Sequence, residues 1–220
     1  MPPAPDLSKL KFGEPIELFN GRDLSGWRIS SAAAERFTAQ AGRLTDLSGK
    51  PLAYPTGDSG WSARDGVLVN DVRPEAGQPP KAYGNLRTDR EFEDFNLTLD
   101  VRVPRQGLSG VFLRGVYEVT VADSLGQPLR SKSMGEVYSR ITPAVAAEKP
   151  SGVWQTLDIT LVDRHVTVIL NGTKTIDNQP VPGCTPWALW GDVTRPGPIY
   201  LRGDKTSVEY RNLILRPVRK

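Results

Sequence analysis

The sequence is poor in the two residue types that most often carry redox, metal or proton-transfer chemistry, with one cysteine and one histidine in 220 residues. Cys184 cannot form an internal disulfide, and a lone cysteine is more often a small buried apolar side chain than a nucleophile. His165 directly follows a predicted hairpin turn, a position that argues against a general base. A His-rich zinc site and a Ser-His-Asp triad centred elsewhere are therefore excluded, and no Cys-x-x-Cys, P-loop or Gly-x-Gly-x-x-Gly pattern is present.

Long apolar runs are also missing, and none approaches the roughly 20 residues that a membrane helix needs. The net charge is +3, with both signs interspersed and a single basic cluster at residues 216–220. A nucleic-acid-binding protein concentrates Lys and Arg on one face with aromatic residues between them, so nucleic acid is not an expected partner. No signal peptide is recognised, and the start MPPAPDLSKLKF resembles a Pro-rich linker after a cleavage site. We expect residues 1–11 to be flexible and residues 12–220 to form one domain.

Turn-forming residues are abundant, with 21 Gly and 19 Pro along the chain. Residues 32–41 are the best helix candidate, with a loop as the alternative, and the long polar segments 46–60 and 73–83 are expected to be functional loops. Asp163-Arg164 is predicted to be a hairpin turn, and Asn171-Gly172 to end the second strand of that hairpin. Many short strands separated by turns predict an all-β fold, a two-sheet antiparallel β-sandwich of the jelly-roll kind. The predicted strands cover residues 16–19, 61–69, 95–103, 110–121, 135–138, 154–162, 165–170, 199–201 and 208–217.

Residues 109–128, SGVFLRGVYEVTVADSLGQP, are the most informative stretch of the chain. The predicted strand 110–121 interrupts its apolar run with Arg114 and Glu118, which have the same parity and so project from the same face. They would lie about 13 Å apart along the strand, so each needs another partner or a ligand. The pattern predicts a polar site on the concave side of a sheet, and the alternative is that both residues form ion pairs within the sheet.

A series of sequence blocks occurs in this order: LFNGRDLSGW, WSARDGVLVN, NLRTDREFEDFNLTLDVRV, SGVFLRGVYEV with ADS, GVWQTLDITLVDRHVTVILNG, and PGPIYLRGD with VEYRNLILRP. Over about residues 12–217, this series resembles the 3-keto-disaccharide hydrolase family, long catalogued as a domain of unknown function. One block alone would be weak support, whereas the ordered series is specific.

The resemblance implies a concanavalin-like lectin/glucanase sandwich and carbohydrate chemistry, mostly in exported bacterial proteins of the periplasm or the cell exterior. Relatives cleave glycosides that already carry a ketone at C3. The ketone acidifies the C2 proton, the C1 substituent leaves by β-elimination once a base has removed that proton, and water then adds to the enone. This chemistry needs a general base and a positive group beside the enediolate oxygen. A sugar or glycoside is the expected ligand, a divalent cation such as Ca²⁺ stays open as a cofactor, and no oligomeric state is predicted.

The sequence departs from the family pattern at places that bear on the site. The family's YEVQ is residues 117–120 here, with Thr120 in place of Gln. Its GAIYG is residues 135–139, with Glu136 in place of Ala. Its GDHG is residues 203–206, so Lys205 stands in place of the histidine.

The resemblance assigns roles to residues of these blocks. Glu118 is the first candidate for the base, and Lys205 is the other candidate. Arg114 and Arg202 would orient and polarise the ketone, since a guanidinium donates several hydrogen bonds. The further residues expected to bind substrate are Tyr138, Asp204 and Glu136. Trp187 and Trp190 stand where relatives usually have small residues, and they are expected either to stack on sugar rings or to pack a long loop.

Other assignments rest on position. Asp123 follows the predicted strand and either binds a metal ion or sugar hydroxyls or caps the turn through its own side chain. Trp27, Trp61 and Trp154 alternate with polar residues and are expected in the core.

Two other functions stay open. A non-catalytic carbohydrate-binding module would keep the cleft and lose the chemistry, which the missing family histidine would allow. A glucanase-type hydrolase would need two carboxyl groups about 5–9.5 Å apart, for which Glu118 with Glu136 or Asp204 are the candidates.

Overall fold

The computed structural model describes residues 2–30, 59–72, 84–203 and 206–219. The predicted helix at 32–41, the loop 73–83 and nearly all of the loop 46–60 lie outside these residues. Among the described residues the only helix is a single 3-10 turn, Leu7–Lys9, capped by Asp6. The same residues contain no helix that is long and apolar enough to cross a membrane. The strands are β1 (Lys11–Phe12), β2 (Ile16–Glu17), β3 (Trp27–Ser30), β4 (Trp61–Arg64), β5 (Val67–Asn70), β6 (Asn85–Thr88), β7 (Phe95–Arg102), β8 (Leu108–Leu113), β9 (Tyr117–Ala122), β10 (Gln155–Val162), β11 (His165–Leu170), β12 (Thr173–Pro180), β13 (Tyr200–Leu201) and β14 (Val208–Arg219).

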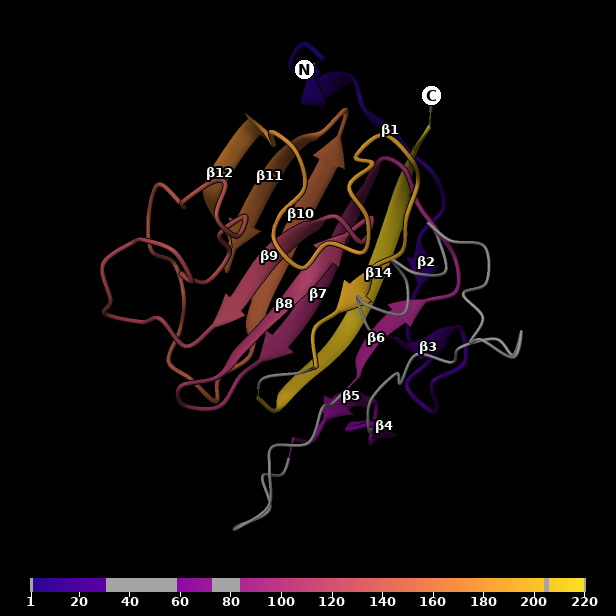
Figure 1. Cartoon of the computed structure of the whole chain (residues 1–220), viewed down its shortest axis with the longest axis vertical. Coiled ribbons are helices and arrows are strands. Elements are labelled where there is room, and N and C mark those ends of the chain that lie inside the picture. Colours follow the sequence, from indigo (N-terminus) through magenta and orange to yellow (C-terminus); the bar gives the residue numbers. More distant parts are fainter. Residues whose placement is uncertain (1, 31–58, 73–83, 204–205, 220) are drawn as a thin grey trace, which may run out of the picture.

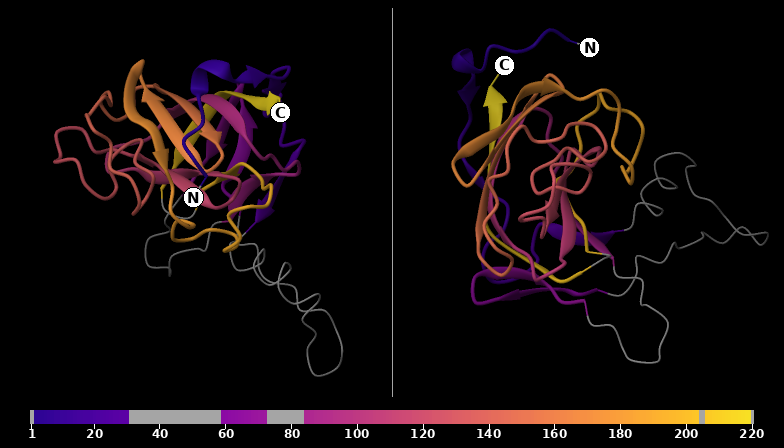
Figure 2. Two further views of the ribbon diagram at one scale, coloured as in Figure 1. Left: turned by 90° about the horizontal axis from the view of Figure 1, so that it is seen from above. Right: turned by 90° about the vertical axis from the view of Figure 1, so that its left-hand side faces the viewer.

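The described strands form two antiparallel sheets, which confirms the predicted β-sandwich. The larger sheet has nine strands in the described part of the chain, ordered β12-β11-β10-β7-β14-β5-β4, with β1 and β2 also paired to β14 (Figure 1). The smaller sheet has five described strands, ordered β3-β6-β13-β8-β9. Figure 2 shows the larger sheet curving around the smaller one. Both chain ends lie at the same edge of the molecule, because β1 pairs with the end of β14 through Lys11 and Arg219 (Figure 1).

The core fills the space between the two sheets. In β7 the burial alternates at every step, as its sequence predicts, and the buried side chains are Phe95, Leu97, Leu99 and Val101. The smaller sheet contributes a second apolar layer. A polar contact also joins the layers, because the Ser109 hydroxyl of β8 lies 3.0 Å from the Tyr210 hydroxyl of β14.

The two turns predicted after β10 are confirmed. Asp163 and Arg164 join β10 to β11 with φ of 47° and 62°, and Asn171 and Gly172 join β11 to β12 with φ of 51° and 83°. Positive φ at both central residues is the geometry that lets a tight turn follow the twist of its flanking strands.

The prediction of single strands at 61–69 and 110–121 was wrong, because each is a hairpin. The turn of the first is Asp65-Gly66, with φ of 50° and 77°, and that of the second includes Arg114-Gly115, with φ of 55° and 66°. In the second hairpin both strands are buried on both faces, so its sequence lacks the polar alternation that would show where each strand ends. Arg114 therefore lies in a turn and not on one strand with Glu118.

The other differences concern short or weakly patterned elements. Residues 135–138 are not a strand but form an isolated antiparallel bridge between Val137 and Val119. Strands β1, β3, β6 and β12 were not predicted. The N-terminal segment expected to be flexible contains the 3-10 turn and enters β1 at Lys11.

Candidate active site

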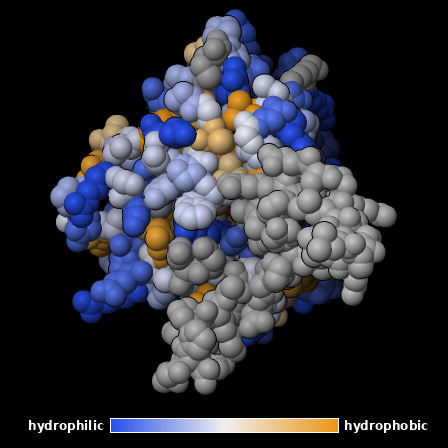
Figure 3. Space-filling view, viewed as in Figure 1, coloured by the Kyte–Doolittle hydropathy of each residue, from blue (hydrophilic) through white to orange (hydrophobic). Residues whose placement is uncertain are grey.

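The smaller sheet has one face against the core and one face turned away from it, which we call its outer face. Ser109 lies on the core face, since its hydroxyl meets Tyr210 of the larger sheet. Successive side chains alternate along a strand, and Phe112 pairs directly with Glu118, so both of these side chains lie on the outer face. Where it is coloured in Figure 3, the surface on this side of the molecule is mostly hydrophilic.

Glu118 and Arg202 form a buried ion pair on the outer face. The Arg202 Nη1 atom donates to Glu118 Oε1 over 3.0 Å, and their side chains are 9% and 1% exposed. Arg202 directly follows β13, and its amide donates to the Gly110 carbonyl of β8 over 2.9 Å. Removing one partner of a buried pair is costly, because it leaves an uncompensated buried charge.

Gly110 makes room for the Glu118 carboxylate. A Cβ atom at position 110 would lie 2.4 Å from Glu118 Oε1 and 2.7 Å from its Cγ. Gly110 pairs with Thr120, the residue two positions after Glu118 on the same face. The glycine therefore fixes where the carboxylate lies above the sheet.

Tyr138 and Glu136 border this site because their segment runs beside β9. The Tyr138 amide donates to the Glu118 carbonyl and the Thr120 amide to the Glu136 carbonyl, each over 2.8 Å. Val137 between them is fully buried and pairs with Val119 on the core face. Alternation then directs the side chains of Tyr138 and Glu136 to the outer face, the same face as the Glu118 side chain.

The Glu136 carboxylate is bound by its own loop. Oε1 accepts from the Ser139 amide over 2.9 Å, and Oε2 accepts from the Lys132 amide. Burial raises the pKa of Glu136 above its usual value of 4.5, although these amide hydrogen bonds oppose the shift. Lys132 and Ser139 have φ of 76° and 60°, so the carboxylate holds together a loop with unfavourable backbone angles.

Arg114 holds the loop between β12 and β13 against the β8–β9 hairpin. Its guanidinium donates to the Val193 carbonyl over 2.6 Å and to the Arg195 carbonyl over 2.7 and 3.1 Å. Its own carbonyl leaves no space for a side chain at Gly197, where a Cβ atom would lie 2.1 Å away. The predicted shared face of Arg114 and Glu118 is thus corrected: in the structure Arg114 binds main-chain carbonyls from a turn.

The same loop carries the two tryptophans predicted to stack on sugars, and only one of them is exposed. Trp187 is 59% exposed and has a φ of 67°. Trp190 is 8% exposed, and the Arg195 guanidinium covers its ring at 4.0 Å. Trp190 is therefore part of the packing of the loop and not a free stacking surface, which corrects that prediction.

Thr185 links this loop to Glu118. Its hydroxyl accepts from the Glu118 amide over 2.9 Å and donates to the Val116 carbonyl over 3.1 Å. Trp187 is two residues further along. The loop that presents the exposed Trp187 is therefore hydrogen-bonded, through Thr185, to the main chain of Glu118.

The remaining predicted site residues lie elsewhere or outside the described residues. Asp123 Oδ2 accepts from the Gln106 amide over 2.8 Å and so binds the loop between β7 and β8, not the turn that follows its own strand. In the part of the chain that the structure describes, no group of three or more His, Cys, Asp or Glu side chains could hold a metal ion. Asp204 and Lys205 are not among the described residues. His165 is buried, with Nδ1 3.1 Å from the Asp163 carbonyl at its own turn.

Of the three tryptophans predicted in the core, two are buried there and one is not. Trp27 and Trp61 are buried core residues. Trp154 is half-buried and lies against Arg102 and Arg211, whose guanidinium carbons are 4.8 and 4.2 Å from its ring centroid. The core prediction was therefore wrong for Trp154.

Sequence reasoning missed two features of the outer face. The Thr120 hydroxyl is buried and has no hydrogen-bond partner in the described structure. It lies on the same face as Glu118, which the sequence had already indicated as a site residue. Tyr200 packs edge-on against Phe112 at 5.2 Å, and its hydroxyl accepts from Asn85 of β6. The presence of Thr120 where the family has Gln could have pointed to the buried hydroxyl. The contact of Asn85 with Tyr200 could not be foreseen, because the sequence of β6 did not predict a strand.

A family model decides what kind of domain this is. The model described as the 3-keto-alpha-glucoside-1,2-lyase-like domain matches residues 14–216. The chain belongs to this family. Glu118, Gly110, Tyr138 and Arg202 all lie within the matched residues, so the outer-face site is part of the family domain.

Solved structures agree on the fold of this 3-keto-alpha-glucoside-1,2-lyase-like domain. A candidate glycosyl hydrolase from Parabacteroides distasonis is 24% identical over 99% of this chain and 93% of its own, with a TM-score of 0.64. A second from the same organism is 18% identical over 93% of this chain and 94% of its own, with a TM-score of 0.65. A third is 25% identical over 71% of this chain and 89% of its own, with a TM-score of 0.54. No curated protein was found to match the chain.

Proposed function

We propose that this protein cleaves 3-keto-glycosides, with Glu118 as the base that removes the C2 proton. The observation that carries the proposal is the buried Glu118–Arg202 pair on the outer face of the smaller sheet. Arg202 stabilises the ionised carboxylate, which is the form a base needs, and its guanidinium places positive charge beside the reacting group. Family membership supports the same chemistry.

The reaction proceeds in two stages. Glu118 takes the C2 proton, and the electron pair of the C2–H bond moves toward C3, so that negative charge collects on the ketone oxygen. Arg202 stabilises that charge. The C1–O bond then breaks, the leaving oxygen takes up the proton from Glu118, and an enone remains. Water adds across the enone, with hydroxide at C1 and a proton at C2, which gives the 3-keto sugar and the released alcohol.

Trp187 is the proposed platform for the sugar ring. A large aromatic residue with positive φ is strained, and such strain is concentrated at functional positions. Its side chain is 59% exposed, although the residues that follow it, Ala188 to Trp190, are buried. Arg114 and Thr185 fix the loop that presents it.

No described contact favours the glucanase-type alternative. Both oxygens of Glu136 accept main-chain amides, so this carboxylate serves its loop. The proposed elimination needs only one base and one stabilising cation, which the Glu118–Arg202 pair supplies.

The test is an assay of the purified protein on 3-keto-trehalose and 3-keto-glucosides, with unoxidised trehalose as the control. We expect sugar release only from the oxidised substrates and its loss in Glu118→Gln. A parallel reaction with a chelator measures any dependence on a metal ion, and Lys205→Met measures the role of the second candidate base. Binding of keto-sugars without release would overturn the proposal in favour of a carbohydrate-binding module.

A further inference from the structure

A pocket lies on the opposite side of the sandwich from Glu118. It has a volume of about 460 Å³ and is lined by residues of β4, β5, β7 and β14 and of nearby loops. Glu209 in its wall pairs with Arg102 and Val69, while the neighbouring Val208 and Tyr210 are buried toward the core. The pocket therefore opens on the outward face of the larger sheet and is separate from the site at Glu118.

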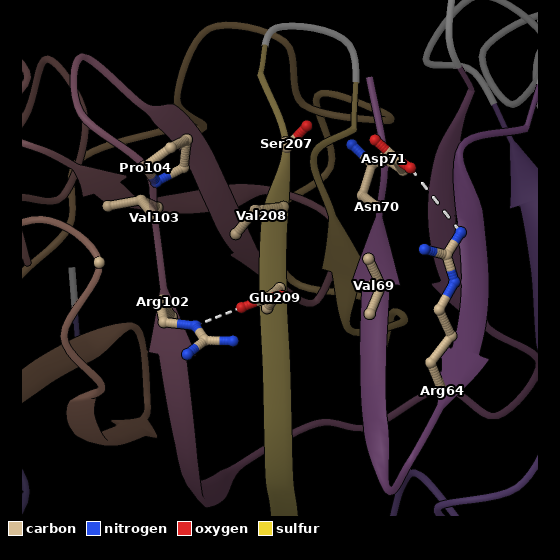
Figure 4. A pocket seen from close by; sticks show the side chains of 11 residues that line it. Arg64, Val69, Asn70, Asp71, Arg102, Val103, Pro104, Ser207, Val208 and Glu209 are labelled. Carbon is tan, nitrogen blue, oxygen red and sulfur yellow. Dashed lines mark hydrogen bonds and ion pairs between the residues drawn. The ribbon is translucent and has the colours of Figure 1, made fainter. Parts of the chain in front are cut away.

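The charged groups of this pocket occur in balanced pairs. Arg102 and Glu209 form an ion pair across β7 and β14, and Arg64 Nη2 lies 3.8 Å from Asp71 Oδ2 (Figure 4). Figure 4 shows each guanidinium pointing toward its carboxylate. The two cations and two anions cancel, so the pocket has no net attraction for an anion or a cation.

Apolar surface lies between the charged pairs. Half-buried Val69 and exposed Pro104 line the same pocket, whereas Val103 and Val208 border it but are buried toward the core. Most small-molecule sites combine such apolar walls with a few polar groups that fix orientation, and they span about 300–1,000 Å³, which includes this volume. The pocket therefore combines hydrogen-bond donors and acceptors with apolar surface that can contact the C–H groups of a ligand.

We propose that this pocket binds a neutral carbohydrate unit, as a second sugar site remote from the one at Glu118. Guanidinium and carboxylate groups offer paired donors and acceptors that match adjacent sugar hydroxyls, and the Val69 and Pro104 side chains contact the ring carbons. Balanced charge disfavours phosphorylated or acidic ligands, and the four charged groups disfavour wholly apolar ones. The inference does not depend on Glu118 acting as a base.

The test measures binding of unoxidised maltotriose, laminaritriose and trehalose by calorimetry and by NMR shift perturbation. The protein used is the full chain carrying Glu118→Gln, so that turnover plays no part. We expect at least one of these sugars to bind. Val69→Trp fills the pocket with a residue that strands accommodate and should abolish binding. Glu209→Gln should weaken binding about tenfold, the usual effect of losing one hydrogen bond to a charged group.

A matched control keeps this test independent of folding and of catalysis. Val145→Trp adds the same side chain at a position that is 44% exposed and far in sequence from the pocket walls. It should bind sugar like its parent. Equal binding in Val69→Trp, Glu209→Gln and the control would overturn the second site, as would the absence of binding by all three sugars. Neither result bears on cleavage of 3-keto-glycosides, which is measured with a different substrate.

Discussion

The Glu118 carboxylate lies directly over the main chain of Gly110. This contact across β8 and β9 leaves 2.4 Å between Oε1 and the place where a Cβ atom of residue 110 would lie. Real side chains do not approach so closely, so any larger residue at position 110 must move the carboxylate. The proposed base is therefore positioned by a residue that has no functional group of its own.

Gly110→Ala should lower kcat on a 3-keto-glycoside by about a hundredfold, the effect expected of a displacement near 1 Å. Gly191→Ala is the control, because nothing lies within 4 Å of a Cβ atom there. Steady-state kinetics and thermal unfolding are measured on both variants. Unchanged kcat in a folded Gly110→Ala protein would contradict the proposed role of Glu118.

Arg202→Met should destabilise the protein by about 3–5 kcal/mol, because it leaves the Glu118 charge buried without its arginine. Adding Glu118→Gln removes that charge, so the double variant should recover part of the lost stability. Urea unfolding of the single and double variants measures this coupling. Strictly additive effects would show that the pair is not energetically linked.

Trp187→Gly should separate binding from stability. Its φ of 67° favours glycine, so relieving the strain offsets the lost packing, and unfolding should shift little or toward higher stability. KM for a 3-keto-glycoside should rise about tenfold, since a stacking surface contributes on the order of 1 kcal/mol or more. Val153→Ala, at a side chain that is 44% exposed, is the control and should leave KM unchanged. A KM for Trp187→Gly equal to that of the parent would remove Trp187 from the site.

Arg114→Met should loosen the loop between β12 and β13, because its hydrogen bonds to two carbonyls are lost. We expect a loss of about 1.5–3 kcal/mol, the range for a hydrogen bond to a charged group, together with faster proteolysis within residues 181–199. Arg114→Lys should recover only part of the loss, since an ammonium cannot reproduce the planar fork. If cleavage of this loop is no faster than in the parent, its anchoring by Arg114 is refuted.

Glu136 should make stability depend on pH in the direction opposite to most carboxylates. Its folded pKa is raised above 4.5, so the folded state holds this proton more tightly than the unfolded chain. The resulting stabilisation is complete below pH 4.5 and is lost as the pH rises through the folded pKa. Relative to Glu136→Gln, the parent should therefore gain stability between pH 8 and pH 4.5, measured by denaturant unfolding. A difference that stays constant over this range would show that the pKa is not raised.

Much of the fold and part of the site follow from the sequence. The strict alternation in β7 and the partial alternation in β14 predict two strands of the larger sheet, and Asp163-Arg164 predicts the hairpin turn after β10. A polar site that includes Glu118 and Tyr138 was expected from the sequence, because Glu118 lies in a block that carries the family resemblance and Tyr138 matches the tyrosine of the family's GAIYG. Such features depend on neighbours along the chain, which is why a local pattern can reveal them.

Only the tertiary structure decided the rest. Arg202 reaches Glu118 across 84 positions of the chain, through strand pairings that no local pattern specifies. The turn at Arg114 was hidden because both strands of its hairpin are buried on both faces, so the alternation that marks a strand's length is absent. The burial of Trp190 and the pocket on the larger sheet likewise depend on which elements pack together. Sequence determined the residue types and the family, and the packing of distant segments determined which of those residues meet.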